Sequence, residues 1–196
     1  MELFERIDAA RERWNVLRHP FYVRWEQGDL SRDELAHYAG EYRHAVVALA
    51  ASAAASGDAK HAQEEADHVG LWDDFASALD APLDRAPAEE THTCAEAWSR
   101  EDRLEALAVL YAIESSQPAI AETKLRGLLD RYAFEEGPAT EYFALHAYRD
   151  VEHAAEAREA LEAAATSADT EHLASVAERA LRANWTLLDG VERASR

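Results

Sequence analysis

The sequence has little cysteine, glycine, proline and positive charge. Its one cysteine, Cys94, excludes an internal disulfide and a cysteine-ligated zinc or iron–sulfur site, and fits a reducing cytoplasm. Seven glycines and five prolines in 196 residues favour helix. Lysine and arginine total 20 against 39 aspartates and glutamates, which gives a net charge of −19 and argues against binding nucleic acid or an anionic membrane.

Long apolar runs are also missing. The longest, Ala45–Ala55, is too short to span a bilayer, and the opening Met1-Glu-Leu-Phe-Glu-Arg6 does not have the pattern of a signal peptide. We therefore expect a cytoplasmic protein that contacts neither membrane nor nucleic acid. Hydrophobic residues make up 48% of the chain, which is enough for a sizeable core.

Apolar residues recur at helical spacing along nearly the whole chain, and strand-like alternation does not persist. Ser31 and Glu34 have the spacing of a capping box, and Pro118 predicts a kink within a helix. We predict a compact all-α bundle of about seven helices forming one domain over residues 1–196. The expected segments are 3–17, 21–27, 32–56, 58–79, 91–98, a helix capped by Ser99 that resumes after Pro118 to Tyr132, 138–165, and a last helix capped by Asp169.

Acidic residues stand three positions before a histidine more often than chance predicts. Composition predicts about two such pairs, whereas the chain has seven, at His37, His44, His61, His68, His92, His153 and His172. Some have simple structural explanations. Asp58 and Glu89 lie in first helical turns, where acids interact favourably with the helix dipole, and Asp169 is a helix cap.

Three segments predict ligands for metal ions. Glu114 lies in a very apolar stretch, where a carboxylate needs a partner. His146, Asp150 and His153 stand at i, i+4 and i+7, on one face of a helix. Glu65, or Glu64 in its place, pairs with His68. Three imidazoles and three carboxylates without thiolate suit two iron ions, with manganese or zinc as alternatives, and iron would activate O2.

Four blocks carry a resemblance to the TenA/PqqC/CADD group, which has the haem-oxygenase-like helical fold. They are His19-Pro-Phe-Tyr22-Val-Arg-Trp25, His68-Val-Gly-Leu-Trp72, Leu110-Tyr-Ala-Ile-Glu114-Ser-Ser-Gln-Pro118 with Lys124-Leu-Arg-Gly127-Leu, and Tyr142-Phe through Asp150-Val-Glu-His153. The resemblance implies a diiron oxidase that binds its metals through Glu65 (or Glu64), His68, Glu114, His146, Asp150 and His153, with O2 as co-substrate. Without a cysteine beside Glu114 the chain does not resemble the thiaminases of the group, and its acidic set separates it from the cofactorless PqqC branch.

Among the diiron oxidases the chain resembles the CADD-like proteins, which make p-aminobenzoate from one of their own tyrosines with a lysine as nitrogen donor. Tyr22 and Lys124 stand at the matching positions. Two departures are a shorter spacing between Glu65 and His68 and Ile113 in place of a tyrosine. Related oxidases decarboxylate or N-oxygenate small organic substrates, and the resemblance also implies a homodimer.

Further residues are expected to lie near the metal ligands or to line a substrate pocket. Gln117 or Glu41 is expected beside the ligands, Glu41 with His44 forms a reserve ligand pair, and Tyr38, Tyr111 or Trp72 is expected to line a substrate pocket. The alternatives from other classes are a metal-free binding or interaction protein of the same fold and a ferritin-like iron store. The histidine–aspartate–histidine segment does not fit the ferritin scheme.

Overall fold

The computed structural model describes residues 2–166 and 169–194, and these ranges form nine α-helices, one 3₁₀ turn and no strand. The prediction of an all-α fold is confirmed, whereas the predicted number of about seven helices is too small. The elements are α1 (Leu3–Arg13), η1 (Val16–Arg18), α2 (Pro20–Gln27), α3 (Arg32–Ser56), α4 (Ala59–Ala78), α5 (Glu89–Trp98), α6 (Arg103–Glu114), α7 (Gln117–Arg131), α8 (Pro138–Ala164) and α9 (Thr170–Ala194).

The break at Pro118 is sharper than a kink. α6 ends at Glu114, and α7 begins at Gln117 with Pro118 in its first turn. A proline lacks the N–H that would bond to the carbonyl four residues earlier, and its ring clashes with that carbonyl. The chain therefore starts a new helix, where the missing N–H has no cost. The break leaves Glu114 at the last position of α6.

Two other boundaries differ from the prediction. α1 ends at Arg13, and Asn15 accepts a hydrogen bond from Leu17 N at 3.1 Å to begin η1. Asp102 caps α6 in place of Ser99, accepting from Leu104 N and Glu105 N at 3.0 Å each. The capping box of α3 is confirmed: Glu34 N donates to Ser31 Oγ at 3.3 Å and Ser31 N donates to Glu34 Oε2 at 2.8 Å.

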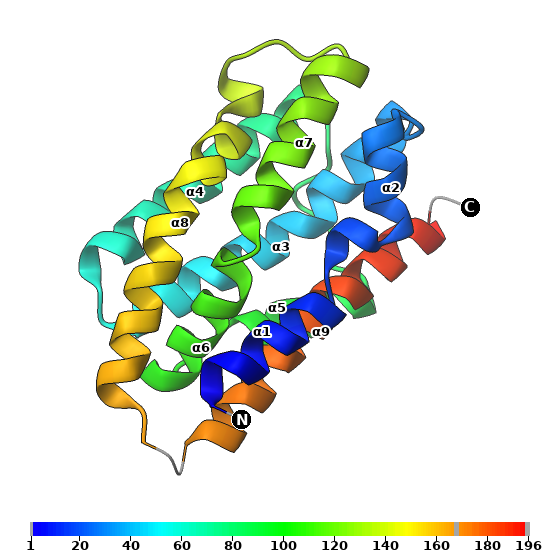
Figure 1. The fold of residues 1–196 in the computed structure, drawn as a ribbon. Coiled ribbons are helices and arrows are strands. Elements are labelled where there is room, and N and C mark those ends of the chain that lie inside the picture. Colours follow the sequence, from blue (N-terminus) through cyan, green and yellow to red (C-terminus); the bar gives the residue numbers. More distant parts are fainter. Residues whose placement is uncertain (1, 167–168, 195–196) are drawn as a thin grey trace.

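The long helices pack side by side around the centre of the molecule (Figure 1). α4 lies against α3 and α8, α8 also contacts α6 and α7, and α9 contacts α5 and α6. α1 and α9 lie together although they come from opposite ends of the sequence. α4, α6 and α8 therefore meet around one interior space, which places residues of distant sequence within contact of one another.

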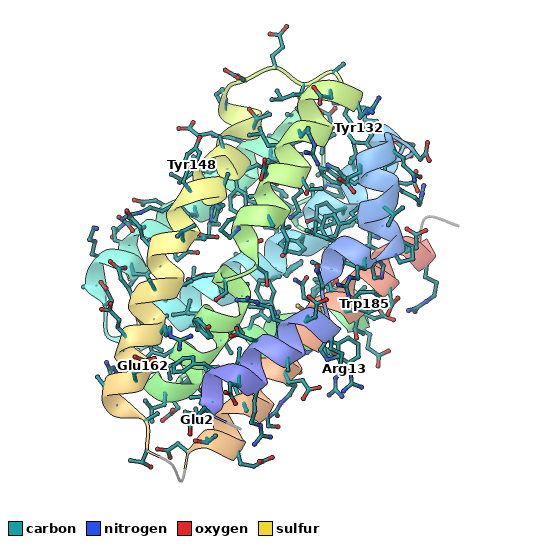
Figure 2. All side chains as sticks on the ribbon, viewed as in Figure 1. Glu2, Arg13, Tyr132, Tyr148, Glu162 and Trp185 are labelled. Carbon is teal, nitrogen blue, oxygen red and sulfur yellow. The ribbon has the colours of Figure 1, made fainter. Side chains whose placement is uncertain are left out.

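Aromatic residues near the surface differ in how far they are exposed. Trp185 of α9 packs edge-on against Trp14 with ring centroids 6.3 Å apart, whereas Tyr148 projects outward from α8 with 69% of its area exposed (Figure 2). No helix in the described part of the chain is long and apolar enough to cross a membrane.

Candidate metal centre

Two antiparallel helices carry the same spacing of histidine, acid and histidine. α4 contributes His61, Glu65 and His68, and α8 contributes the set His146, Asp150 and His153. Residues at i, i+4 and i+7 share one helix face, and here both faces point inward, because all six side chains are buried. Glu114, at the end of α6, is buried beside them.

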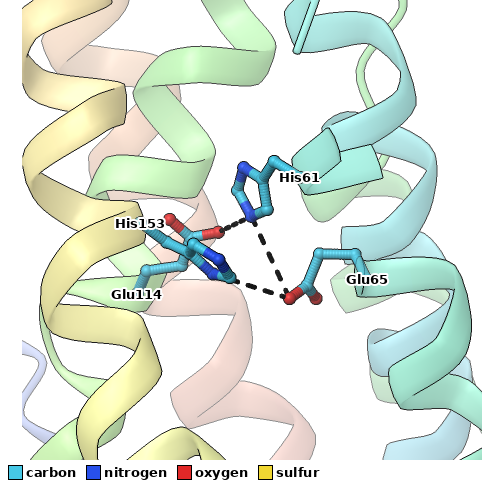
Figure 3. Close-up of side chains that lie close together, drawn as sticks. All are labelled: His61, Glu65, Glu114 and His153. Carbon is cyan, nitrogen blue, oxygen red and sulfur yellow. Dashed lines mark ion pairs between the residues drawn. The ribbon is translucent and has the colours of Figure 1, made fainter. Parts of the chain in front are cut away.

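One group of four side chains gathers at the His61 end of this face (Figure 3). His61 Nε2 lies 3.0 Å from Glu114 Oε1 and 4.0 Å from Glu65 Oε1. His153 Nδ1 also lies 4.0 Å from Glu65 Oε1, and the His61 and His153 rings have centroids 4.1 Å apart. Two imidazoles and two carboxylates thus converge from three helices.

A second group of three shares Glu65 with the first. His68 Nδ1 lies 2.7 Å from Glu65 Oε1, and the His68 and His146 rings have centroids 4.5 Å apart. On α8, Asp150 stands between His146 and His153, and its Oδ1 lies 3.8 Å from His153 Nδ1. The six side chains predicted as ligands therefore lie in one buried cluster, with Glu65 at its centre.

Several ligand atoms of this cluster lack any hydrogen-bond partner. They are His61 Nε2, both oxygens of Glu114, both oxygens of Asp150, and His153 Nδ1. His61 Nε2 and Glu114 Oε1 are close, but they are not aligned to bond to each other. Buried polar atoms without partners cost free energy. A metal ion among them would satisfy these lone pairs, and nitrogen and carboxylate donors without thiolate fit iron.

Hydrogen bonds on the outer side fix the direction of two imidazoles. His153 Nε2 pairs with Glu64 Oε2 at 2.9 Å, and Arg149 holds Glu64 at 2.8 Å, so Nδ1 faces the cluster. His146 Nδ1 donates to Tyr142 O at 2.6 Å, which leaves Nε2 free to accept. Such outer partners orient metal-binding histidines. Glu64, 28% exposed, thus lies outside the cluster and Glu65 inside it.

Burial shifts the pKa of the cluster's carboxyl groups. It raises the pKa of Glu114 to about 7, against the favourable effect of His61. Burial and the charges of Glu114 and Glu65 raise the pKa of Asp150 well above its ordinary value. The pKa of Glu64 changes in the other direction. Burial raises it, but hydrogen bonds from His153 and Arg149 outweigh that effect and lower the pKa to about 2. The hydrogen bond with His68 lowers the pKa of Glu65 as well, against the effect of burial. The charged forms of Glu114 and Asp150 are therefore disfavoured in the metal-free cluster, and a bound cation would favour them.

Lys124 and Tyr22 lie together in an aromatic cage. The Lys124 ammonium is within 5.6 Å of five ring centroids, those of Tyr22, Tyr38, Tyr42, Trp72 and Phe143. Lys124 is 1% exposed, and no carboxylate of the described residues pairs with it. Burial lowers its pKa to about 7. Tyr22 is also buried, and its hydroxyl lies 2.9 Å from that of Tyr38.

The cage and the cluster are neighbours. Tyr142 stacks on His146 with centroids 4.0 Å apart and meets Trp72 of the cage edge-on at 4.9 Å. The positive charge of Lys124 also contributes to lowering the pKa of His146 to about 4, after the larger effect of burial. The His68–His146 end of the cluster thus faces the cage, and the His61–Glu114 end lies away from it.

The remaining predicted residues have other surroundings. Glu41 accepts hydrogen bonds from Ala88 N at 3.1 Å and from the Thr91 hydroxyl, both at the start of α5, and His44 contacts Arg85 O, so the reserve pair does not form. Tyr111 bonds to Asp8 and Arg158. Gln117 is buried near Asn184 and makes no hydrogen bond with the cluster. Tyr38 and Trp72 belong to the cage.

Sequence reasoning missed His61. Its pair with Asp58 was explained by the start of α4, and Asp58 does cap that helix by accepting from Lys60 N and His61 N. The signal that could have identified His61 is the repeated spacing, because His61, Glu65 and His68 match His146, Asp150 and His153 position for position.

Comparison with known proteins agrees with this arrangement. Residues 15–186 match the family described as iron-containing redox enzyme. A 4-aminobenzoate synthase of Nitrosomonas europaea is 30% identical over 95% of this chain and 89% of its own. A domain of unknown function with a haem oxygenase-like fold from Shewanella denitrificans superposes with a TM-score of 0.78 at 18% identity, covering 99% of this chain and 93% of that one.

A TenA homologue from Pseudomonas syringae has the same fold, with a TM-score of 0.76 at 18% identity over 97% of this chain and 91% of that one. The predicted haem-oxygenase-like fold and the predicted kinship with the TenA and CADD group are confirmed. The chain belongs to the family of iron-containing redox enzymes and is an oxidoreductase.

Proposed function

We propose that this protein is a non-haem diiron oxidase that uses O2 to form 4-aminobenzoate from its own Tyr22, with Lys124 as the nitrogen donor. The observation that carries the proposal is one of placement. A buried cluster with unpartnered ligand atoms adjoins a cage that holds a tyrosine and an unpaired lysine together. The relatives named 4-aminobenzoate synthase support the product.

Seven side chains would hold the two metal ions. They are the six predicted from the sequence, Glu65, His68, Glu114, His146, Asp150 and His153, and the added His61. Three carboxylates offset most of the charge of two divalent ions, and manganese in place of one iron is an alternative that the same donors fit. Iron held there supplies the reduction and activation of O2.

The ring of Tyr22 has the substitution pattern that the product needs. Tyrosine carries a carbon and an oxygen at opposite positions of its ring, and 4-aminobenzoate carries a carboxyl carbon and a nitrogen at the same two positions. The buried site excludes water from the ring. The Tyr38 hydroxyl, 2.9 Å from that of Tyr22, can exchange a proton with it.

Lys124 is suited to supply the nitrogen. A protonated amine has no lone pair with which to react, but a pKa of about 7 leaves a large share of Lys124 as the neutral amine at neutral pH. Five aromatic rings surround its amine, and no carboxylate of the described residues pairs with it. The sequence has only one other lysine, Lys60, at the start of α4.

A metal-free binding protein of the same fold explains the cluster less well. Such a protein would gain nothing from six unpartnered atoms on buried carboxylates and histidines. The outward hydrogen bonds of His146 and His153 also turn their free nitrogens toward the cluster, as metal ligands require.

The test is single-turnover product analysis. The purified protein is loaded with ferrous iron without oxygen, mixed with O2 and a reductant, and examined by mass spectrometry for 4-aminobenzoate and for a change in chain mass. We expect Tyr22→Phe to bind iron but form no product. Tyr148→Phe, which changes an exposed tyrosine of α8, should behave as the parent.

Two results would contradict the proposal. One is unchanged product in Tyr22→Phe. The other is an iron-loaded parent that consumes O2 but releases no 4-aminobenzoate and leaves its own mass unchanged, in which case an external substrate of the decarboxylating or N-oxygenating kind becomes the better explanation.

A further inference from the structure

A hollow open to solvent adjoins one end of the cluster. Its volume is about 510 Å³, and it lies between the turn from α3 to α4, the first turns of α6 and the second half of α8. His61 is the only one of the seven cluster side chains that lines it. Leu107, Ala157 and Ala160 form other parts of its wall.

His61 has one side in the hollow and the other in the cluster. The residue lines the hollow, while its Nε2 lies 3.0 Å from Glu114 Oε1. Its side chain is 5% exposed, the highest value in the cluster together with that of His68. From the hollow, the way to Glu114 therefore leads past this residue.

We infer that this hollow is the route by which divalent metal ions enter the cluster, with His61 as the first ligand that they meet. The inference rests on the proposed function, because it presupposes that the cluster binds metal. It adds a direction: ions arrive at the His61–Glu114 end, and the reacting tyrosine and lysine lie beyond the opposite, His68–His146 end.

Two acidic and two basic residues line the hollow, Asp58 and Glu156 against Lys60 and Arg103. Lys60 lies 3.7 Å from Glu64, and Arg103 Nε donates to Ser56 O at 2.8 Å. Glu156 lines the hollow and forms no ion pair or hydrogen bond with the described residues. A carboxylate at the mouth, on a chain with a net charge of −19, raises the local concentration of cations.

The walls favour a small occupant over an organic substrate. Gly57, Ala59, Ala157 and Ala160 leave room but offer little apolar area for a ring to bury against. In the proposed reaction the consumed ring is already part of the protein, at Tyr22. The hollow therefore has no organic substrate to admit.

The test measures metal uptake, not activity. Co²⁺ serves as the probe, and its visible absorption is followed after rapid mixing with metal-free protein. Ala160→Trp fills the hollow, so we expect uptake to lose its fast phase and proceed only as the bundle opens locally, with the final amount bound unchanged. Ala155→Trp, on the exposed side of the same helix, should keep the fast phase.

A second variant tests the charge without filling the space. Glu156→Lys should slow uptake by about 10-fold at low ionic strength, and the difference should shrink as salt is added. Parental rates in both Ala160→Trp and Glu156→Lys would overturn the route while leaving the metal site intact. Absence of Co²⁺ binding to the parent itself would overturn the metal site and, with it, the route.

Discussion

At the residue scale, the proposed diiron site makes a prediction for His61. This residue supplies an unpartnered nitrogen to the group with Glu114 and His153. We expect His61→Ala to reduce bound iron from about two per chain to about one, because the remaining donors at that end are too few for a stable site. The measurement is anaerobic titration with ferrous iron followed by metal analysis.

The matched control is His44→Ala. His44 lies outside the cluster, where its Nε2 contacts Arg85 O at 3.2 Å. It should bind as much iron as the parent. Full iron content in His61→Ala would show that His61 is not a ligand.

Glu64 acts on the cluster only through His153. Removing its charge by Glu64→Gln weakens the hold on His153 Nε2, so iron affinity should fall by about 10-fold with the number of ions unchanged. Glu152→Gln is the control, since Glu152 also pairs with Arg149 but is exposed and does not contact His153. Equal affinities for the two variants, measured by competition with a chelator, would exclude an orienting role.

Lys124 should make stability depend on pH. Its pKa is about 7 in the folded protein against 10.5 for a free side chain, so the unfolded chain binds more protons between these values. The free energy of unfolding should therefore rise with pH from about 7 to 10.5, by at most about 1.4 kcal/mol per pH unit. Urea unfolding of the metal-free parent and of Lys124→Met across this range checks it. Parallel pH profiles would mean that Lys124 is not held in an environment that disfavours its charge.

At the element scale, the position of α2 against α7 controls the cage. Trp25 Nε1 donates to Lys124 O at 3.1 Å, and a Cβ on Gly127 would lie 2.5 Å from that same nitrogen. Gly127→Ala should therefore force α2 away from α7 and lower the free energy of unfolding by about 1–3 kcal/mol. Product formation should fall while iron binding persists, because the proposed metal ligands lie on other helices.

Gly70→Ala provides the comparison on α4, which carries three of the proposed metal ligands. A Cβ at Gly70 meets no atom within 4 Å, so the change should stabilise α4 by up to about 1 kcal/mol. Thermal unfolding of both variants separates the two effects. A Gly127→Ala protein as stable and active as Gly70→Ala would show that the α2–α7 contact does not position Lys124.

Element boundaries show where sequence reasoning succeeds and fails. Capping chemistry is local, so Ser31 and Glu34 predicted the start of α3 correctly. The choice between a kink and a full break at Pro118 depends on what surrounds it, and here the two helices on either side of the break both contact α8. Ser99 and Asp102 are both good caps by residue type, and only the path of the chain selects Asp102.

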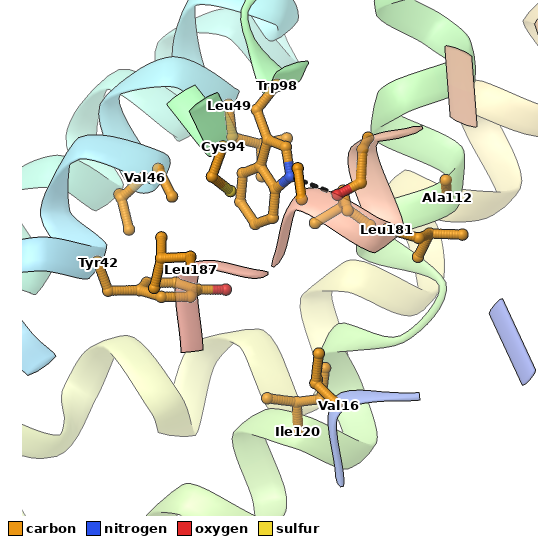
Figure 4. Packing of buried hydrophobic residues seen from close by; sticks show 14 of the residues in the cluster. Val16, Tyr42, Val46, Leu49, Cys94, Trp98, Ala112, Ile120, Leu181 and Leu187 are labelled. Carbon is orange, nitrogen blue, oxygen red and sulfur yellow. Dashed lines mark hydrogen bonds between the residues drawn. The ribbon is translucent and has the colours of Figure 1, made fainter. Parts of the chain in front are cut away.

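At the scale of the whole molecule, the helical spacing of apolar residues was enough to predict the fold class. Figure 4 shows the result where α3, α5 and α9 meet: Tyr42, Trp98 and Leu187 gather in the core, and Trp98 donates to Ala180 O. The pairing of helices could not be read from spacing, because any apolar stripe can face any other. The six residues could be proposed from the sequence because polar groups in such stripes need partners, whereas the approach of His61 to Glu114 depends on how α4 and α6 each pack against α8.

The most direct test of the central claim is to follow the nitrogen of Lys124 into the product. The chain is made with ε-¹⁵N-lysine, loaded with iron and exposed once to O2, and the 4-aminobenzoate is weighed by mass spectrometry. The account predicts ¹⁵N in the product of the parent and of Lys60→Arg, and no product from Lys124→Met. Unlabelled 4-aminobenzoate, or labelled product from Lys124→Met, would contradict it.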